Sequence, residues 1–239
     1  MIKRIAILAG CLSTITAIAG FFGHVHPIGD SLAVFQLPLA LIGAVLLWRA
    51  PLVLLTPAAC IAAISVAIVF TPKLSTATPG PYTVYQKNLL YKLDDPQLLI
   101  DDILTRLPDV VMMQEVGEAN QRVLEGLKEA YPNQLHCPYG SIGGTAVMTR
   151  WPVTGETECA EFGGLSAIKA LSPEGPVWLV SLPLRWPYPY PQSNQVWELR
   201  PILQALDAPI ILAGDFNMVP WSHSVRTILR ATGTRYSGV

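Results

Sequence analysis

Two short motifs, each at the end of an apolar run, carry the residue types that phosphate and metal chemistry needs. The run VVMMQ leads into Glu115, and the run IILA leads through a glycine into Asp215 and Asn217, while Asn88 ends an earlier segment, TVYQKN. Carboxylate and amide oxygens suit a hard cation such as Mg²⁺, which keeps several of its waters. A metal there could polarise a phosphoryl oxygen while a neighbouring carboxylate activates the attacking water.

These residues also have a plainer interpretation, because Asp and Asn commonly begin turns at the ends of strands. Each motif taken singly is more often a turn than a site, but their co-occurrence favours a site. In a strand, a spacing of two residues places the side chains of Asp215 and Asn217 on one face, so both could address the same phosphorus atom. Phe216, between them, is expected to point the other way, into the core.

Alternating strands and helices are needed to position these residues. After residue 81, β-branched and aromatic runs predict strands, and apolar residues at helical spacing predict helices. The expected strands are 82–91, 108–116, 145–149, 167–171, 177–182 and 210–213, and the expected helices are 95–107, 118–131, 193–206 and 222–231. Ser222 is expected to cap the last helix. The sequence therefore predicts an α/β (α+β) layered domain.

The first third of the chain is far more apolar than the rest. The chain is 51% hydrophobic and only 14% charged, and residues 5–23, 32–48 and 52–70 contain no Asp, Glu, Lys or Arg. Each run is close to the roughly 20 residues that a bilayer-spanning helix needs. We expect three transmembrane helices. The alternative for the first run is a cleaved signal peptide, because Lys3 and Arg4 precede it.

The domain organisation and the cellular location follow from these helices. We expect a transmembrane region over 1–70, a linker over 71–81, whose Pro, Gly, Ser and Thr content is typical of a connection, and a domain over 82–239. The positive-inside rule assigns the basic N-terminus and Arg49, between the second and third runs, to the cytoplasm. The expected protein is a multi-pass protein of the inner (plasma) membrane, bound to the lipid bilayer, with an extracytoplasmic (periplasmic) C-terminal domain.

Cysteines and charge bear on the compartment and on the ligand. Cys137 and Cys159 lie in the expected outer domain, where an oxidising compartment allows a disulfide, but sequence spacing leaves their pairing open. From residue 71 onward, 13 Lys plus Arg stand against 16 Asp plus Glu. A protein that grips long nucleic acid usually carries a positive face, so this balance weakens a nuclease hypothesis without excluding it.

The order and spacing of five motifs resemble the endonuclease/exonuclease/phosphatase superfamily. The motifs are QKNLL, PDVVMMQEV, GGTAVMTRWP, LRWP and ILAGDFN. The resemblance covers about residue 82 to the C-terminus and implies a metal-dependent phosphoesterase, in a superfamily that includes pancreatic deoxyribonuclease, inositol-polyphosphate phosphatases and bacterial sphingomyelinases. It also implies a sandwich of two mixed β-sheets flanked by helices. The helical N-terminus is similar to the anchors of membrane-bound bacterial members.

The resemblance implies a role for each matching residue. Glu115 would be the principal ligand of Mg²⁺ or Mn²⁺, and Asn88 would assist at the metal and the phosphate. Asp215 would orient and activate the nucleophilic water, and Asn217 would hold the scissile phosphate. Arg150, at the end of GGTAVMTR, is a candidate phosphate contact, the alternative being an exposed arginine at a strand end.

Two departures from the family pattern bear on activity. Pro183 stands where members usually have a histidine, and proline offers no side-chain donor or acceptor. Members also end with an Asp-His pair, and neither His136 nor His223 fits that motif, so His223 is expected to be a solvated residue in the first turn of its helix. We therefore expect a partial domain without the C-terminal segment, and truncation is favoured over evolved loss because the other motifs are intact.

The loop 185–192 (RWPYPYPQ) is expected to rim the site. Its aromatic residues Trp186, Tyr188 and Tyr190 could stack on a base or lie against lipid. Alternating proline and aromatic residues more often simply stiffen a loop.

Three functions from different classes follow. The first is a membrane-anchored phosphoesterase acting on a phosphodiester or phosphomonoester, with nucleic acid, a phospholipid or a small phosphate ester as substrate. The second is a catalytically inactive extracytoplasmic binding module of the same fold, for which Pro183 is evidence. The third is a membrane protein whose outer domain only scaffolds partners, none of which the sequence identifies.

Overall fold

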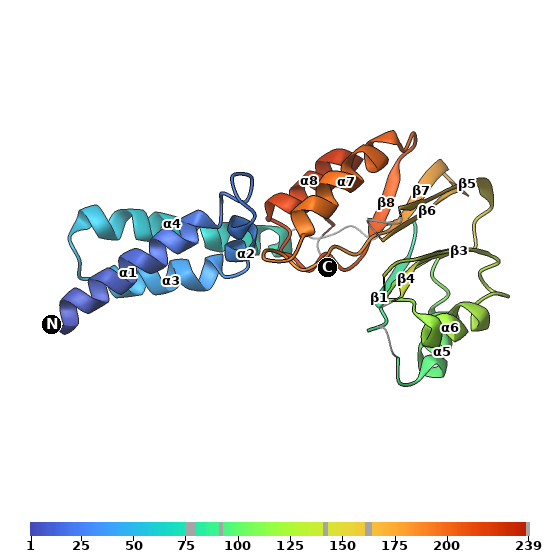
Figure 1. The fold of residues 1–239 in the computed structure, drawn as a ribbon, viewed down its shortest axis with the longest axis horizontal. Helices are drawn as coiled ribbons and strands as arrows, with labels where there is room; N and C mark the ends of the chain where they lie inside the picture. Colours follow the sequence, from blue (N-terminus) through green and yellow to red (C-terminus); the bar gives the residue numbers. More distant parts are fainter. Residues whose placement is uncertain (75–79, 91–92, 141–142, 161–163, 238–239) are drawn as a thin grey trace.

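A computed structural model describes the chain from residue 1 to 239, apart from residues 75–79, 91–92, 141–142, 161–163 and 238–239. It contains a helical bundle formed by the N-terminal part of the chain and an α/β domain formed by the rest (Figure 1). The two parts meet at one end of the bundle, where Asp30 of α2 (Ile28–Ala33) contacts the start of α8 (His223–Thr232).

The bundle consists of α1 (Ile2–Ala19), α2 (Ile28–Ala33), α3 (Gln36–Leu47) and α4 (Leu52–Leu74). α1 and α3 pack antiparallel, with the Ser13 hydroxyl donating to the carbonyl of Leu39 at 2.8 Å and Gly43 lying against Thr14. α1 and α4 both run toward the domain, and α3 runs in the opposite direction (Figure 1). The N-terminus and the turn between α3 and α4 therefore lie at the end of the bundle away from the domain.

Within the described part of the chain, two helices rather than three are long and apolar enough to cross a membrane, α1 and residues Leu52–Thr71 of α4. The prediction of a spanning helix for 32–48 is wrong. α2 ends at Ala33, and Phe35 leaves the helical conformation (φ −98°, ψ 7°) before α3 begins. The 12 residues of α3 extend about 18 Å, short of the ~30 Å hydrocarbon core of a bilayer. A signal sequence near the N-terminus would pass the same length and composition test as α1.

The predicted linker 71–81 begins inside a helix. α4 continues to Leu74, so the first four residues of that range are helical. Residues 75–79 lie outside the described residues, and residues 80 and 81 are neither helix nor strand.

The domain contains two four-stranded mixed sheets. The first has the order β1-β2-β4-β3, with β1 and β2 parallel and the other neighbours antiparallel. The second has the order β5-β6-β7-β8, with β7 and β8 parallel and the other neighbours antiparallel. The strands are β1 (Val84–Asn88), β2 (Val110–Gln114), β3 (Asn133–Pro138), β4 (Gly144–Thr149), β5 (Val153–Ala160), β6 (Leu165–Ser172), β7 (Gly175–Ser181) and β8 (Ile210–Ala213).

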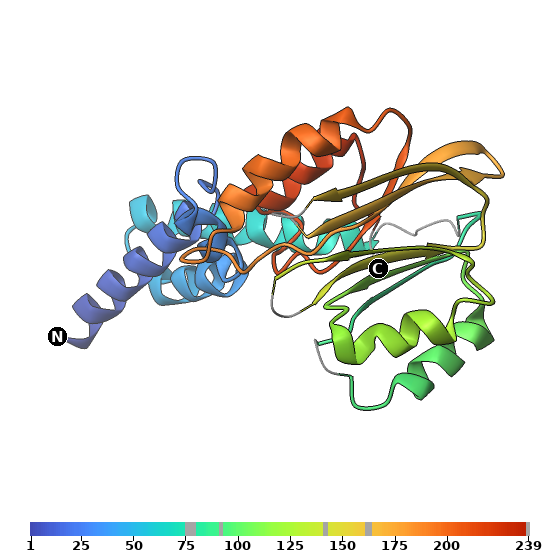
Figure 2. The same cartoon turned by 45° about the vertical axis from the view of Figure 1, so that its right-hand side comes forward.

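Helices cover the outer face of each sheet, and the two sheets pack against each other (Figures 1 and 2). One apolar cluster fills each of the three interfaces, and Met112 and Leu179 lie in the one between the sheets. The helices are α5 (Pro96–Arg106), the 3-10 helix η1 (Glu118–Asn120) and α6 (Gln121–Gly126) on the first sheet, and α7 (Gln192–Ala205) and α8 (His223–Thr232) on the second. The two-sheet sandwich implied by the family resemblance is confirmed.

The structure contains two strands, β3 and β5, that the sequence pattern did not predict. The helix expected over 118–131 is shorter in the structure. β3 is partly exposed along most of its length and β5 is largely exposed, because each lies at the edge of its sheet. Such strands lack the continuous apolar run that identifies β2, so their local pattern is weak. The single 118–131 element is divided into η1 and α6, and α6 ends at Gly126.

Parallel pairing brings the ends of strands from both sheets to one edge of the sandwich. Asn88 pairs with Gln114 at the end of β1 and β2, and Ser181 pairs with Ala213 at the end of β7 and β8. Gln114 is fully buried, and its side-chain amide donates to the Ser181 hydroxyl at 2.9 Å. That hydroxyl donates to the carbonyl of Met113, also at 2.9 Å. This network joins the two sheets beneath the strand ends.

Cys137 and Cys159 form a disulfide, a pairing that the sequence left open. It connects β3 of the first sheet to β5 of the second, with a Cα–Cα distance of 5.7 Å. The two residues are 22 positions apart, and both lie on edge strands whose packing the sequence did not reveal. The bond closes the sandwich at the edge formed by β3 and β5.

Asp30 attaches the bundle to the domain. Its carboxylate is only 4% exposed and accepts hydrogen bonds from the backbone N–H groups of His223 (2.7 Å) and Ser224 (2.9 Å) and from the Ser224 hydroxyl (2.6 Å). The first N–H groups of a helix have no partners within it. A bundle residue thus helps to cap α8, together with the predicted cap Ser222, whose hydroxyl accepts the N–H of Val225 at 3.2 Å.

His223 is partly buried at this junction instead of being solvated as the sequence predicts. The loop after α1 covers it, and the rings of His223 and His24 lie 6.1 Å apart. Burial lowers the pKa of His223, and the nearby Asp30 carboxylate acts in the opposite direction. The sequence around Ser222 contains no sign that a distant loop would cover this turn.

Removing the disulfide is expected to destabilise the domain. A Cys137→Ala/Cys159→Ala variant should lose about 3 kcal/mol of free energy of unfolding, because the unfolded chain regains the freedom of a loop of this length. Urea unfolding of the detergent-solubilised chain, with and without reductant, measures the difference. Reductant should destabilise the natural chain and leave the variant unchanged, and equal stabilities of the two oxidised proteins would contradict the expectation.

Gly214 is required where the chain leaves β8. The N–H of Leu182 donates to the carbonyl of Ala213 at 3.1 Å, and the N–H of Leu184 donates to the carbonyl of Asp215 at 2.8 Å, so the backbone is held on both sides of the glycine. A Cβ atom at Gly214 would overlap the carbonyl oxygen of Leu182. Backbone atoms held in this way cannot move aside as a flexible side chain can.

A Gly214→Ala substitution should therefore lower the free energy of unfolding by about 1–3 kcal/mol, as overpacking usually does. The matched control is Gly80→Ala, where an added Cβ would meet only the carbonyl oxygen of Tyr82, at 3.9 Å. Urea unfolding measures both variants against the natural chain. A Gly214→Ala protein as stable as the control would show that this close approach is not constrained.

Candidate active site

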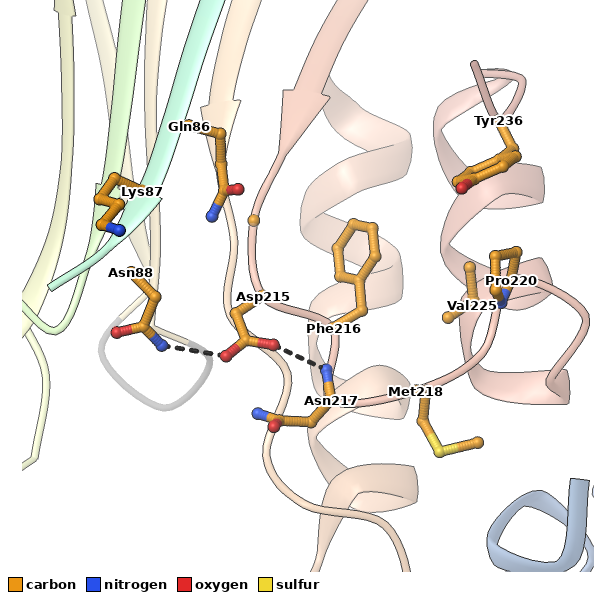
Figure 3. A pocket seen from close by; sticks show the side chains of 11 residues that line it. Gln86, Lys87, Asn88, Asp215, Phe216, Asn217, Met218, Pro220, Val225 and Tyr236 are labelled. Carbon is orange, nitrogen blue, oxygen red and sulfur yellow. Dashed lines mark hydrogen bonds between the residues drawn. The ribbon is translucent and has the colours of Figure 1, made fainter. Parts of the chain in front are cut away.

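Four of the five predicted site residues line one cavity of about 230 Å³. Asn88 ends β1, Glu115 follows β2, and Asp215 and Asn217 follow β8. Figure 3 shows three of them, Asn88, Asp215 and Asn217, around an adjoining hollow that Lys87 also lines. The structure thus brings together residues from both sheets. Asn88 and Asp215, which are hydrogen-bonded to each other, are 127 positions apart in the sequence.

The side-chain amide of Asn88 lies between two carboxylates. Its Nδ2 donates to Glu115 Oε1 and to Asp215 Oδ2, each at 2.9 Å, and Figure 3 shows the second bond. An NH₂ group has two hydrogens, so these bonds use both. Asn88 Oδ1 accepts the N–H of Leu90 at 2.8 Å, which orients the amide. The two carboxylate oxygens are separated by at most twice the hydrogen-bond distance, so both acids face the same small volume.

Glu115 adopts a backbone conformation that is rare for residues other than glycine, with φ +58°. Two sets of contacts hold it there. The N–H and carbonyl of Val116 pair with Gly144 at 2.8 and 3.1 Å, and the buried Asn120 donates from Nδ2 to the Glu115 carbonyl at 3.0 Å. Strained backbone of this kind persists where the surroundings over-determine it, often at functional sites. Here it turns the chain so that Glu115 lines the cavity.

Asp215 and Asn217 follow the strand and are not part of it. β8 ends at Ala213, so strand alternation does not explain their common orientation, and that part of the prediction is wrong. Instead, Asp215 Oδ1 accepts the backbone N–H of Asn217 at 3.0 Å in an Asx turn, with Asn217 at φ +48°. Asn217 Nδ2 donates to the carbonyl of Leu184 at 2.8 Å. Phe216 packs against the cluster between the second sheet and its helices, but it is only partly buried and also lines the hollow shown in Figure 3.

Arg150, the fifth predicted residue, lies away from the other four. β4 is antiparallel to β2, so Thr149 pairs with Val110 at the start of β2, whereas Glu115 follows its end. Arg150 forms an ion pair with Asp109 at 2.9 Å, measured from Nη2 to Oδ1. Because the direction of strand pairing cannot be read from a motif, the sequence did not reveal this separation.

Arg185 is a cation at the cavity that the predicted site omits. Its Nε donates to Tyr139 Oη at 2.7 Å, and both residues line the cavity. Its backbone N–H donates to Gln195 Oε1, also at 2.7 Å. The sequence signal that could have identified Arg185 is its position in the LRWP motif. Pro183, two residues earlier, also lines the cavity and contributes no side-chain donor.

Asn120 and Gln114 form hydrogen bonds beneath the site, and the sequence pattern predicts no role for either. Both are fully buried. Asn120 Oδ1 accepts the N–H of Leu93 at 3.0 Å, which ties the segment after β1 to the segment after β2. Asn120 falls inside the helix expected over 118–131, where one polar residue carries no special signal.

The aromatic loop connects the cavity to the bundle. Trp186 and Tyr190 line the cavity and are 64% and 61% exposed. Between them, Tyr188 packs edge-on against His26 with ring centroids 5.4 Å apart, and its carbonyl accepts the Ser31 hydroxyl at 2.7 Å. The mouth of the cavity therefore lies on the side of the domain that meets the bundle.

The donors at the cavity fit a hard cation. Among the described residues, no group of three or more His, Cys, Asp or Glu could hold a metal. Mg²⁺ is commonly bound by one or two carboxylates, with waters and substrate phosphate completing its shell. Glu115 and Asp215 supply that number of carboxylates around the Asn88 amide.

Comparison with known proteins relates the domain to a described family. A family model described as the endonuclease/exonuclease/phosphatase family matches residues 86–237, which include all four cavity residues. Comparison with curated proteins finds no match. A β-hairpin deletion mutant of beta toxin from Staphylococcus aureus superposes with a TM-score of 0.52 and 14% identity over 64% of this chain and 73% of that chain.

Two further solved structures have the same kind of likeness. A mutant beta toxin from Staphylococcus aureus with bound magnesium ions gives a TM-score of 0.51 and 14% identity over 64% of this chain and 70% of that chain. Sphingomyelinase C from Streptomyces griseocarneus gives a TM-score of 0.46 and 18% identity over 65% of this chain and 70% of that chain. At these identities the beta toxin likeness establishes the fold alone. Since the family model covers more than half of the sequence, the chain belongs to the endonuclease/exonuclease/phosphatase family.

Proposed function

We propose that this chain is a metal-dependent phosphoesterase acting at the cavity lined by Asn88, Glu115, Asp215 and Asn217. The observation that carries the proposal is the Asn88 amide, which bridges carboxylates from two sheets. Two carboxylates held this close repel each other, and a divalent cation beside them relieves the repulsion. Mg²⁺ or Mn²⁺, held chiefly by Glu115 with Asn88 assisting, would polarise a phosphoryl oxygen of the substrate.

Asp215 would orient the attacking water and take its proton. Its Oδ1 accepts the N–H of Asn217 and its Oδ2 accepts from Asn88, which holds the carboxylate in one orientation. Each carboxylate oxygen can accept a second hydrogen bond, so capacity for a water is left. Asn217 Nδ2 uses one hydrogen on Leu184 and has a second for an oxygen of the scissile phosphate.

Arg185 would supply the positive side-chain donors that Pro183 cannot. Its guanidinium uses Nε on Tyr139 and has further N–H groups that match phosphate oxygens. Loss of one transition-state donor typically lowers a rate on the order of 10²–10³-fold. We therefore expect turnover to be slow compared with family members that have a histidine at the position of Pro183.

The surroundings of the cavity favour a phosphate ester carried by a lipid. Trp186 and Tyr190 form an exposed aromatic rim, and Tyr188 links that rim to the bundle. Aromatic rings are favoured where an apolar and an aqueous phase meet. Nucleic acid and soluble phosphate esters are the alternative substrates, and the excess of acidic residues in the domain weighs against long nucleic acid.

The bundle would anchor the domain in the inner (plasma) membrane, with the domain in the periplasm. α1 and α4 run in the same direction, so the chain between them would return inside the bundle through α3, which is too short to span the bilayer by itself. The N-terminus with Lys3 and Arg4 therefore lies at the same end as Arg49, away from the domain (Figure 1). The positive-inside rule assigns that end to the cytoplasm. The disulfide supports an oxidising compartment for the domain.

A Glu115→Ala substitution should lower kcat on the order of 10²–10³-fold, because it removes the main metal-binding group. The assay is phosphate or headgroup release by the full-length protein in detergent with Mg²⁺, tested on a lysophospholipid, single-stranded DNA and an inositol phosphate. EDTA should abolish the activity. The matched control is Glu118→Ala, which removes an exposed carboxylate outside the cavity. Undiminished turnover by the Glu115→Ala protein would contradict the assignment.

The second candidate function is a catalytically inactive binding module of the same fold. Pro183 at the cavity is the observation in its favour. Calorimetric binding of Mg²⁺ without hydrolysis of any of these substrates would support the binding module. Metal-dependent turnover by the natural chain would eliminate it.

Fusing a reporter after Pro81 tests the topology. Alkaline phosphatase, which is active only outside the cytoplasm, should be active there, because the proposed orientation exports everything after α4. β-Galactosidase, which needs the cytoplasm, fused at the same position is the reciprocal control and should be inactive. The reverse pattern would contradict the periplasmic location.

A further inference from the structure

A second cavity lies where the bundle meets the domain. It has a volume of about 410 Å³ and is bounded by the loop after α1, by α7 and by α8. It shares no lining residue with the candidate active site. Its lining includes His24, Trp197, Arg200, His223 and Arg230, a combination rich in cationic and aromatic groups.

Two arginines line this cavity from different helices, Arg200 on α7 and Arg230 on α8. Over the described part of the chain, neither takes part in an ion pair or a side-chain hydrogen bond, in contrast to Arg106, which pairs with Asp102 at 2.8 Å. A guanidinium group presents a planar set of N–H donors that matches the oxygens of a phosphate. Two such groups at one cavity favour an anionic ligand with oxygen acceptors.

The acidic side chain at this cavity is already engaged. Asp30 is the one acidic residue among the described residues that line the cavity, and its carboxylate accepts three hydrogen bonds from His223 and Ser224. Burial lowers the pKa of His223, Asp30 acts in the opposite direction, and Arg230 is among the neighbouring cations that add to the lowering. The remaining charge of the lining is therefore positive.

The position of the cavity indicates where its ligand would come from. The loop of residues 23–30 follows the end of α1 that faces the domain, and Trp221 on the domain donates from Nε1 to the carbonyl of Ala33 at 3.1 Å. Trp197, at the cavity, is 73% exposed. Tryptophan is enriched at the boundary between the hydrocarbon core and water. If α1 and α4 cross a membrane, lipid headgroups lie beside this lining.

We propose that this cavity binds the phosphate of a phospholipid headgroup, with Arg200 and Arg230 as its main contacts. The proposal rests on the membrane anchoring in the proposed function and is independent of catalysis. The same donors would also suit free phosphate, but the exposed Trp197 beside them favours a ligand with an apolar part. A bound lipid would hold the domain against the membrane surface, beside the contact that Asp30 of the bundle makes with the start of α8.

The test is calorimetric titration of the full-length protein in maltoside detergent with EDTA, which removes metal-dependent binding at the active site. The probes are dihexanoyl phosphatidylglycerol and inorganic phosphate. The lipid should bind the natural chain, and an Arg200→Ala/Arg230→Ala variant should bind it roughly tenfold more weakly, because two exposed charge-assisted contacts are lost. The control, Arg122→Ala/Lys128→Ala, removes the same charge from exposed residues elsewhere on the domain and should bind like the natural chain.

Three results would overturn the proposal. They are unchanged lipid affinity in the Arg200→Ala/Arg230→Ala variant, an equal loss in the control, and inorganic phosphate binding as tightly as the lipid, which would identify a free-phosphate site. Thermal unfolding of each variant verifies that the fold is intact, and an Arg200→Lys/Arg230→Lys variant should recover part of the affinity because it keeps the charge. Lipid binding by a protein that hydrolyses nothing would leave this proposal standing while the proposed catalysis fails.

Discussion

The site depends on one amide group. Asn88 shares its two N–H hydrogens between the carboxylates of Glu115 and Asp215, each at 2.9 Å, so a neutral side chain holds together two acids that would otherwise repel each other. The acids belong to different sheets, and the same contact therefore closes the sandwich at its functional edge. A divalent cation and a phosphate ester would enter a site whose acidic groups are already oriented, which lowers the cost of arranging them.

This arrangement is possible because the polar groups behind it are satisfied. Gln114 is fully buried, yet its side chain bonds both Gln86 and Ser181, and Ser181 in turn bonds the backbone of Met113. A buried network of this kind is costly if any member is left unpaired and rigid when all are paired. The unusual backbone of Glu115, at φ +58°, persists on that rigid base.

The bundle and the domain are joined by specific contacts in addition to the chain that connects them. Asp30 helps to cap α8. Tyr188, which lies between the aromatic rim residues of the cavity, contacts His26 and Ser31 of the bundle. A domain on a free tether would sample many orientations, whereas these contacts restrict it to one. In the proposed membrane setting, the active-site rim and the cavity with Arg200 and Arg230 both lie on the side of the domain that meets the bundle. Lipid binding and ester hydrolysis would then operate on the same surface.

The sequence by itself determined the apolar strands and the acids and amides that follow them, because apolar runs and the residues after them are local signals. It predicted β2 and β8 and the polar residues that follow them, although it placed Asp215 and Asn217 in a strand instead of the observed turn, and the family resemblance implied the two-sheet sandwich. It did not determine the edge strands β3 and β5, the helix break at Phe35, the pairing of Cys137 with Cys159 or the distance of Arg150 from the site. Those features were decided by the direction of strand pairing and by the packing of sheet on sheet, physical relations between residues far apart in the chain that no local pattern records.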